Sequence, residues 1–222
     1  MSELSCPSCG APVPVRSAAL PYVTCPYCQT LIRREGEALS AIGKSAVLPF
    51  DVSPIQLGTA GSFGPVRFSV AGRVRWGWAD GSWNEWLLDC SDGQPRWLGE
   101  AMGSFMLTEE HPELLERAEL HGFAEGAALA RGTRLTLGDE EFEASDIKTA
   151  QCLGSEGELP RPTPAASELV SIDLRGSRGG VISLQRDGAG PSAWLGTALD
   201  LAALRPTGLR QLDGWTIPVG LR

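Results

Sequence analysis

Two pairs of closely spaced cysteines near the N-terminus are the residues best suited to chemistry. Each pair has the spacing Cys-x-x-Cys with a proline after the first cysteine, and the members are Cys6, Cys9, Cys25 and Cys28. Such a turn places two thiolates on one side of a tight loop, and two facing turns complete a tetrahedron of sulfur ligands. We therefore predict that these four side chains hold a zinc ion.

The predicted zinc ion has a structural role, because four protein thiolates leave no open position for water or substrate. Residues 1–36 are too few to bury much apolar surface, so this ribbon would depend on the metal for its stability. Two disulfides and a rubredoxin-like iron are the alternatives. Paired Cys-x-x-Cys turns favour a reducing compartment, and we expect a cytoplasmic protein.

A run of tryptophans around one carboxylate is the second group of residues that could bind a ligand or carry out chemistry. Its members are Trp76, Trp78, Trp83, Glu85, Trp86 and Trp97. On adjacent strands these rings would form cross-strand pairs in a core, or present a surface to a protein partner. Burial among indoles would raise the pKa of Glu85, but no second carboxylate is evidently paired with it. We expect Glu85 to reach solvent or to pair with Arg73 or Arg75, and we predict no catalytic residue.

The net charge of −8 comes from the middle of the chain, since the acidic residues concentrate between residues 100 and 160. Proteins that follow phosphate backbones normally show a basic stripe, and none is visible here. In the ribbon, Arg16, Arg33 and Arg34 are nearly balanced by acidic residues. No stretch reaches the roughly 18 apolar residues of a membrane-spanning helix, and the N-terminus does not resemble a secretory signal.

Beyond the ribbon, the pattern is typical of short strands joined by turns. Apolar and polar residues alternate over residues 66–78, and the turn signals Asp80-Gly81 and Asp92-Gly93 separate further strand-like stretches. One helix is predicted over Pro112–His121, with Gly122 as its stop. A second β region follows from about residue 131 to 204, interrupted by a proline-rich loop at 160–164.

The two β regions look like copies of one module. Gly58-Thr59 precedes Phe68 by the same interval as Gly132-Thr133 precedes Phe142, at an offset of 74 residues. The triplet Trp-Leu-Gly recurs at 97–99 and 194–196, at an offset of 97. We interpret the difference of 23 residues as an insertion that includes the proline-rich loop.

These patterns predict a mainly β protein with an N-terminal zinc ribbon. Two tandem small antiparallel β modules, each a partly open barrel, follow the ribbon and are joined by a short helix. The expected segments are a zinc ribbon (1–36), a linker (37–54), a first β module (55–110), a helical connector (111–128) and a second β module (129–222).

Several of these motifs together resemble a bacterial family, domain of unknown function 4178. The motifs are Gln56-Leu57-Gly58-Thr59, Phe68-Ser69-Val70-Ala71-Gly72-Arg73, Trp83-Asn84-Glu85-Trp86 and Trp97-Leu98-Gly99-Glu100. The resemblance is strong over residues 54–108 and weaker to about residue 204. Leu87-Leu88 departs from the family, in which an aromatic residue is common after Trp86. Members often carry an N-terminal double-knuckle zinc ribbon, as this chain does.

The resemblance implies no reaction. Members of the family tend to be encoded near polyamine-synthesis-like enzymes and membrane-stress proteins, which implies an accessory role in a membrane-associated assembly. We therefore expect a non-enzymatic zinc-ribbon adaptor that mediates protein–protein interaction in a bacterial cytoplasmic or membrane-peripheral system. Its partner would be another protein.

Two alternatives remain open. The ribbon could bind nucleic acid, although its weak positive charge makes this unlikely. The β modules could instead form an enzyme or a polyamine-binding module. A concave pocket that holds Glu85 beside another titratable group would favour this last possibility, and a filled tryptophan core would exclude it.

Overall fold

The structure is a computed structural model, and it describes residues 2–17, 19–214, 216–218 and 221. Met1 and Arg222, the ends of the first and last expected segments, lie outside the described residues. The predicted architecture is confirmed: the fold is mainly antiparallel β, with one short α-helix between two groups of strands. No helix among the described residues is long and apolar enough to cross a membrane.

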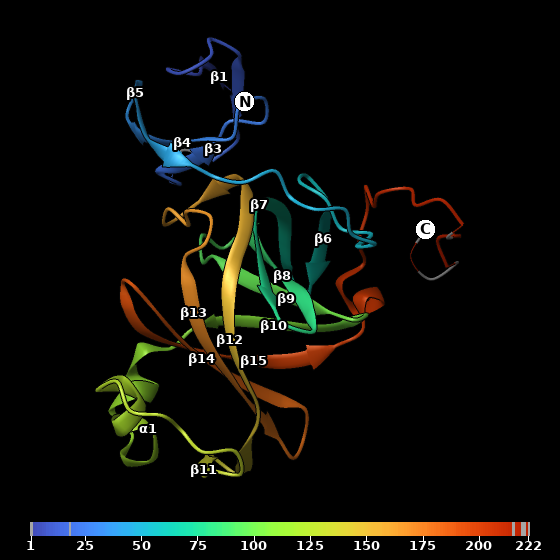
Figure 1. Cartoon of the computed structure of the whole chain (residues 1–222). Coiled ribbons are helices and arrows are strands. Elements are labelled where there is room, and N and C mark those ends of the chain that lie inside the picture. Colours follow the sequence, from blue (N-terminus) through green and yellow to red (C-terminus); the bar gives the residue numbers. More distant parts are fainter. Residues whose placement is uncertain (1, 18, 215, 219–220, 222) are drawn as a thin grey trace.

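The N-terminal ribbon lies at one end of the molecule, with the ring of strands beneath it and helix α1 at the opposite end (Figure 1). Its first two strands form a separate hairpin, and the next three continue into the main sheet. The ribbon strands are β1 (Ser2–Ser5), β2 (Pro12–Val15), β3 (Tyr22–Thr24), β4 (Thr30–Glu35) and β5 (Ala38–Lys44).

Strand β5 occupies part of the stretch that was expected to be a linker at 37–54. It pairs antiparallel with β4, from Glu35 opposite Ala38 to Thr30 opposite Lys44. Most of its side chains are exposed, so the strand shows no apolar alternation and rests on main-chain hydrogen bonds to β4. The connection without regular structure therefore starts only after Lys44.

The two β modules each contribute five strands. The first module contains β6 (Ala60–Phe63), β7 (Val66–Trp78), β8 (Gly81–Cys90), β9 (Arg96–Ala101) and β10 (Ser104–Glu110). The second contains β11 (Arg134–Leu137), β12 (Glu140–Leu159), β13 (Glu168–Gly176), β14 (Gly180–Asp187) and β15 (Gly190–Leu199).

Strand pairing between the modules closes a ring. β10 pairs with β15 at one seam, and β12 pairs with β7 at the other. The ring runs β7-β8-β9-β10-β15-β14-β13-β12 and returns to β7. The ring-like bonding thus passes through both modules instead of closing within each one, and a shared ring leaves fewer free sheet edges than two open ones would.

The helical connector differs in detail from the predicted helix. It forms a 3-10 turn, η1 (Pro112–Glu116), and then α1 (Ala118–Ala124). Between them Arg117 is extended, with φ −69° and ψ 140°. Gly122 lies inside α1 and does not end it. The helix continues because Leu120 and Phe123 are both buried against the second module.

The proposed repeat is clear at the start of each module. Gly58 and Gly132 adopt φ of 86° and 82°, and each donates its N–H to a residue twelve positions later, Val70 and Ala144. The Trp-Leu-Gly part of the repeat is wrong. Trp97 lies on β9, the fourth strand of its module, whereas Trp194 lies on β15, the fifth, so the inferred offset of 97 joins strands that do not correspond.

The two faces of the ring strands differ in chemistry, because successive residues of a strand point to opposite faces. One face of the first module packs beneath a second 3-10 turn, η2 (Leu201–Leu204), in a cluster with Trp86 and Leu98. One face of the second module packs beneath α1 in a cluster with Ile172 and Ile182. The remaining faces of the two modules meet inside the ring.

Candidate functional site

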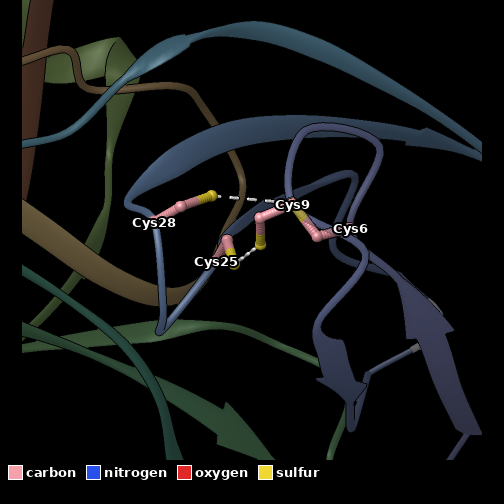
Figure 2. A group of neighbouring side chains, drawn as sticks. All are labelled: Cys6, Cys9, Cys25 and Cys28. Atoms are coloured by element: carbon pink, nitrogen blue, oxygen red, sulfur yellow. Dashed lines mark hydrogen bonds between the residues drawn. The ribbon is translucent and has the colours of Figure 1, made fainter.

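The four predicted cysteine ligands converge between the two knuckle loops (Figure 2). The sulfur atoms of Cys6 and Cys28 are 3.7 Å apart, and those of Cys9 and Cys25 are 3.8 Å apart. All four sulfurs lie within 4.8 Å of one another. A tetrahedron with Zn–S bonds of about 2.3 Å has edges of about 3.8 Å, whereas a disulfide requires about 2.0 Å. The arrangement could therefore hold a metal ion.

The two knuckles share one backbone conformation. In each, the residue after the second cysteine donates its N–H to the carbonyl of the first, from Gly10 to Cys6 and from Gln29 to Cys25. Both donors have a left-handed backbone, with φ of 75° at Gly10 and 56° at Gln29. The turn thus directs both sulfurs of a pair to one side, and the second knuckle does so with a residue that disfavours this conformation.

The local environment prepares Cys28 for metal binding. The hydroxyl of Thr30, whose oxygen lies 3.2 Å from the sulfur, and then the Thr30 backbone N–H lower the pKa of Cys28 to about 6. A metal binds the thiolate and not the thiol. At neutral pH this sulfur therefore meets little competition from protons. Cys9 differs: against the lowering effect of the Ala11 backbone N–H, the Cys28 side chain raises the pKa of Cys9 to about 12, and burial raises the pKa of Cys25.

The ribbon is joined to the ring along the end of β12. Residues of β3 pair with β12, with Thr24 opposite Gly157 and Val23 opposite Glu158. The buried carboxylate of Glu158 also accepts the backbone N–H groups of Arg16, at 2.8 Å, and of Ser17. The two cysteine turns are thus fixed to the strand that closes the ring.

The predicted tryptophan surface is not an outer surface. Trp86 is completely buried and Trp76 nearly so, which removes both from direct contact with a partner in this fold. The other three, Trp78, Trp83 and Trp97, are half-buried. Trp76 stacks on Trp83 with ring centroids 6.4 Å apart, as expected for a cross-strand pair. Apart from Trp86, these rings face the ring interior.

Glu85 points into the ring and not to either predicted arginine. Its Oε2 accepts the indole N–H of Trp76 at 2.9 Å, and its Oε1 accepts the indole N–H of Trp83 at 3.1 Å. The side-chain amide of Gln185, from the second module, donates to Oε1 at 2.6 Å. Burial raises the pKa of Glu85, and these three hydrogen bonds oppose the rise.

Arg73 and Arg75 instead bind Asp51, in the connection after β5. The carboxylate of Asp51 pairs with Arg73, with Arg75 at 3.2 Å and with Arg210 at 2.5 Å. Three cations and one buried carboxylate thus fix this connection and the C-terminal segment to the ring. Sequence reasoning missed Asp51, because its partners lie 22 to 159 residues away.

Two adjoining pockets open from the ring interior, and Glu85, Gly99 and Met106 line both. The first, here the Trp97 pocket, has a volume of about 200 Å³. Its other walls include Trp76, Trp97, Thr108, Gln185 and Trp194. The second, here the Trp83 pocket, has a volume of about 250 Å³. Its other walls include Trp78, Trp83, Lys148, Ser171 and Asp173.

Asp173 is the second titratable group beside Glu85. Burial raises the pKa of Asp173, while the Ser183 hydroxyl at 2.9 Å and the charge of Arg175 lower it. The negative charge of Asp173 in turn raises the pKa of Glu85. Glu85 therefore lies in a concave site with a titratable neighbour, which is the observation expected to favour an enzyme or a polyamine-binding module.

The pocket residues of the second module were missed by sequence reasoning, although β13 carries a signal for them. Ser171, Asp173 and Arg175 alternate there with the buried residues Ile172 and Leu174. A polar face opposite an apolar face is the normal pattern of a strand with one solvated side. Only the closure of the ring turns that polar side into a pocket wall.

The acidic middle of the chain is used for internal contacts. Arg134 pairs with Glu143 at 2.6 Å, and Arg178 pairs with Asp139 at 2.5 Å. One carboxylate oxygen of Glu140 accepts the backbone N–H of Arg178 at 2.7 Å. Two arginines thus offset about half of the negative charge between Asp139 and Glu143.

Comparison with known proteins gives one match. The model of the family described as a domain of unknown function, DUF4178, matches residues 56–201. No curated protein and no solved structure matches the chain. The matched stretch begins before β6, includes both β modules and ends at the start of η2. Because it covers well over half of the sequence, the chain belongs to the DUF4178 family.

Proposed function

We propose that this protein is a non-enzymatic accessory protein that binds a small molecule inside the ring. The observation that carries the proposal is the pair of pockets that meet at Glu85. In a typical β fold, the apolar faces of opposed strands fill the space between them. Here each module buries one apolar face beneath a short helix. A third apolar cluster, which includes Val74, Leu87 and Leu169, fills part of the enclosed space, and the pockets lie beside it, walled by tryptophan rings and polar groups.

The side chains around the pockets support binding rather than catalysis. Fixed donors hold both carboxylates: two indoles and an amide on Glu85, and a hydroxyl on Asp173. None of the residues that line either pocket is a histidine or a cysteine, so the walls offer no imidazole base and no thiol nucleophile. We expect a bound molecule to be released unchanged, and mass spectrometry after prolonged incubation would detect any product.

A fragment screen on the full chain tests the proposal. Ligands that bind only the folded state raise the melting temperature, and we expect at least one small neutral, cationic or anionic fragment to do so. Met106→Trp would fill the space shared by the pockets and abolish the shift. Val47→Trp places the same bulk on a residue that is 76% exposed, and would leave the shift intact.

The proposal fails if no fragment of any charge class changes the melting temperature. It fails equally if the shifts persist in Met106→Trp, because the fragments would then bind elsewhere. Quenching of tryptophan fluorescence tests ligand binding in the unmodified chain without any variant, since five of the tryptophans line the Trp97 or Trp83 pocket.

For the ribbon, we propose a structural Zn²⁺ ion in a reducing, cytoplasmic setting. Four thiolates at tetrahedral spacing support this assignment, since they satisfy zinc and leave no position for a reacting molecule. We propose no nucleic-acid binding for the ribbon, because two of its three candidate arginines are engaged within the chain. Arg34 donates to the carbonyls of Ser17 and Leu20, and Arg33 pairs with Glu35. Elemental analysis would show one zinc per chain, whereas bound iron would colour the protein.

A second candidate function is the adaptor role, for which we propose the connection after β5 as the contact. Val47, Phe50 and Val52 are 76%, 84% and 74% exposed, and Asp51 between them is anchored to three arginines. A fixed loop with outward apolar side chains suits a partner protein with an apolar surface. A partner purified with the native chain should be lost with Phe50→Ser and kept with Met102→Ser, which changes an exposed apolar residue elsewhere.

A further inference from the structure

Glu85 is a carboxylate with no cation of its own. All three of its hydrogen-bond donors are neutral: the indoles of Trp76 and Trp83 and the amide of Gln185. Within the part of the chain that the structure describes, it forms no ion pair, although Asp173 beside it pairs with Arg175 at 3.6 Å. Glu85 is half-buried, so its carboxylate is partly removed from water without a counter-ion, and a cation supplied from outside would offset that cost.

One acceptor position on this carboxylate is free. Each carboxylate oxygen can accept about two hydrogen bonds. The Oε1 atom already accepts from Trp83 and Gln185, whereas Oε2 accepts only from Trp76. A ligand with an N–H group can therefore donate to Oε2 without displacing any donor of the chain.

The tryptophan rings beside Glu85 suit the same kind of ligand. The faces of indole rings attract cations within about 6 Å. Trp97 and Trp194 line one wall of the Trp97 pocket, in edge contact with each other at 6.3 Å. Among the described residues, the cations that lie over tryptophans use Trp78 and Trp86, and neither Trp97 nor Trp194 has one.

The charges around both pockets favour a positive ligand. Acidic side chains outnumber basic ones by one in the two linings together: Glu85, Asp146, Asp173 and Asp187 against Lys148, Arg161 and Arg175. Glu100 also lines the Trp83 pocket, but Ser53, Asn84 and Trp86 donate to its buried carboxylate. Lys148 is also occupied, because it pairs with Asp146 at 2.9 Å. The linings therefore carry a small excess of negative charge, and the charge of Glu85 remains for an incoming cation.

We propose that the ring binds a small organic ammonium ion whose N–H group donates to Oε2 of Glu85 and whose alkyl part lies against the tryptophans of the Trp97 pocket. This assignment rests on the proposed function and names its ligand class. Trp76, Trp83 and Gln185 act as positioning residues that keep the carboxylate directed into the pocket.

Titration calorimetry with the full chain tests the ligand class. The probes are n-butylammonium and two compounds of similar size, neutral n-butanol and anionic butyrate. We expect n-butylammonium to bind most tightly, and Glu85→Gln to weaken it by at least about tenfold, because the substitution keeps the shape and removes the charge. Glu110→Gln, at an exposed position of β10, is the matched control and would leave the affinity unchanged.

Nuclear magnetic resonance of the indole N–H groups gives a second readout on the unmodified chain. Addition of n-butylammonium should shift the signal of Trp76, which shares Oε2 with the ligand. The signal of Trp86 should stay in place, because its indole donates to Glu100 at 2.8 Å outside the Trp97 pocket. The comparison of the Trp76 and Trp86 signals shows whether n-butylammonium binds at Glu85 even if Glu85→Gln fails to fold.

The possible outcomes separate the ligand class from the proposed function. If n-butanol binds and n-butylammonium does not, the ring binds small molecules but the ammonium assignment is wrong. If Glu85→Gln binds n-butylammonium as tightly as the native chain, or if the Trp76 signal does not move, the assignment is also overturned. If none of these probes and no fragment of the screen binds, both proposals fall.

Discussion

Gly72 of β7 and Gly157 of β12 lie directly opposite each other in the antiparallel pair that joins the two modules. A Cβ atom at Gly72 would overlap the backbone carbonyl oxygen of Glu158, and one at Gly157 would overlap that of Ala71. The seam therefore closes only because both positions lack a side chain. The same stretch of β12 also receives β3, so the ribbon and both modules meet here.

We expect Gly72→Ala to destabilise the chain by about 3 kcal/mol, because the added methyl group meets backbone atoms that cannot rotate away. Chemical denaturation would measure the loss. Gly188→Ala is the control, since a Cβ there has no neighbour within 4 Å, and its effect should stay within about 0.5 kcal/mol. Equal stability of the two variants would show that the seam is looser than described.

Loss of the metal should release the ribbon. Cys9 is exposed, so Cys9→Ser changes no core packing and acts through the metal alone. We expect metal content to fall and the ribbon to lose at least about 2 kcal/mol of stability, seen as faster hydrogen exchange in β3 and β4. Cys90→Ser should keep the metal, because Cys90 lies in the core of the first module. Unchanged metal content in Cys9→Ser would exclude the four-thiolate site.

Substitutions at the turn residues of the two knuckles, Gly10 and Gln29, should change the stability of the chain in opposite directions. The left-handed backbone conformation is unfavourable for Gln29, whereas Gly10 adopts it without a steric clash. Gln29→Gly should stabilise the metal-loaded chain by about 0.5 kcal/mol, and Gly10→Ala should destabilise it by about 1 kcal/mol. Denaturation midpoints of both variants give the comparison. A loss of stability in Gln29→Gly would mean that the Gln29 side chain contributes more than its backbone costs.

The pH dependence of stability should reflect the raised pKa of Asp173 in the folded chain. Burial raises its pKa above the ordinary value of 3.8 in the folded chain, against the opposing effects of Ser183 and Arg175. Between the unfolded and folded pKa values the folded state binds more protons, so stability falls as pH rises through that window. Asp173→Asn removes this loss. The variant should therefore gain stability relative to the native chain at neutral pH, and the gain should vanish below about pH 3.8.

Asp92→Asn is the comparison variant, because the pKa of Asp92 is lowered in the folded chain whereas that of Asp173 is raised. The backbone N–H of Gln94, and then Arg96, lower the pKa of Asp92 in the folded chain. Its stabilising effect is therefore present above the unfolded pKa and is lost as the pH falls through the folded pKa. Thermal melts from pH 3 to pH 8 would show opposite trends for the two variants. Parallel trends would contradict the assigned burial of Asp173.

Local features of this fold could be predicted from the sequence. The Cys-x-x-Cys spacing identified all four members of the cysteine cluster, because a knuckle is formed by adjacent residues. Gly58 and Gly132 identified the start of each module, since both need the same left-handed turn. The alternation of residues 66–78 predicted β7, because a period of two is typical of a strand. Burial along β7 does not follow this period throughout, since residues 70–74 are all buried.

Features that depend on distant residues could not be predicted in this way. The partner of Glu85 is Gln185, 100 residues away, and a sequence interval gives no sign of that contact. Trp97 and Trp194 suggested a repeat, but they are neighbours in space because β10 and β15 are paired. The ring itself is a long-range property, since both of its seams join strands from different modules.

Those two seams give the molecule the character of a dimer within one chain. Each module presents two strands whose hydrogen-bonding edges match only the other module, through β7 with β12 and β10 with β15. The connector from Pro112 to Ala124 packs on the second module alone and takes no part in either seam. Two separate polypeptides, cut at this connector, would have every contact needed to assemble, and each would act as the obligatory subunit of the other.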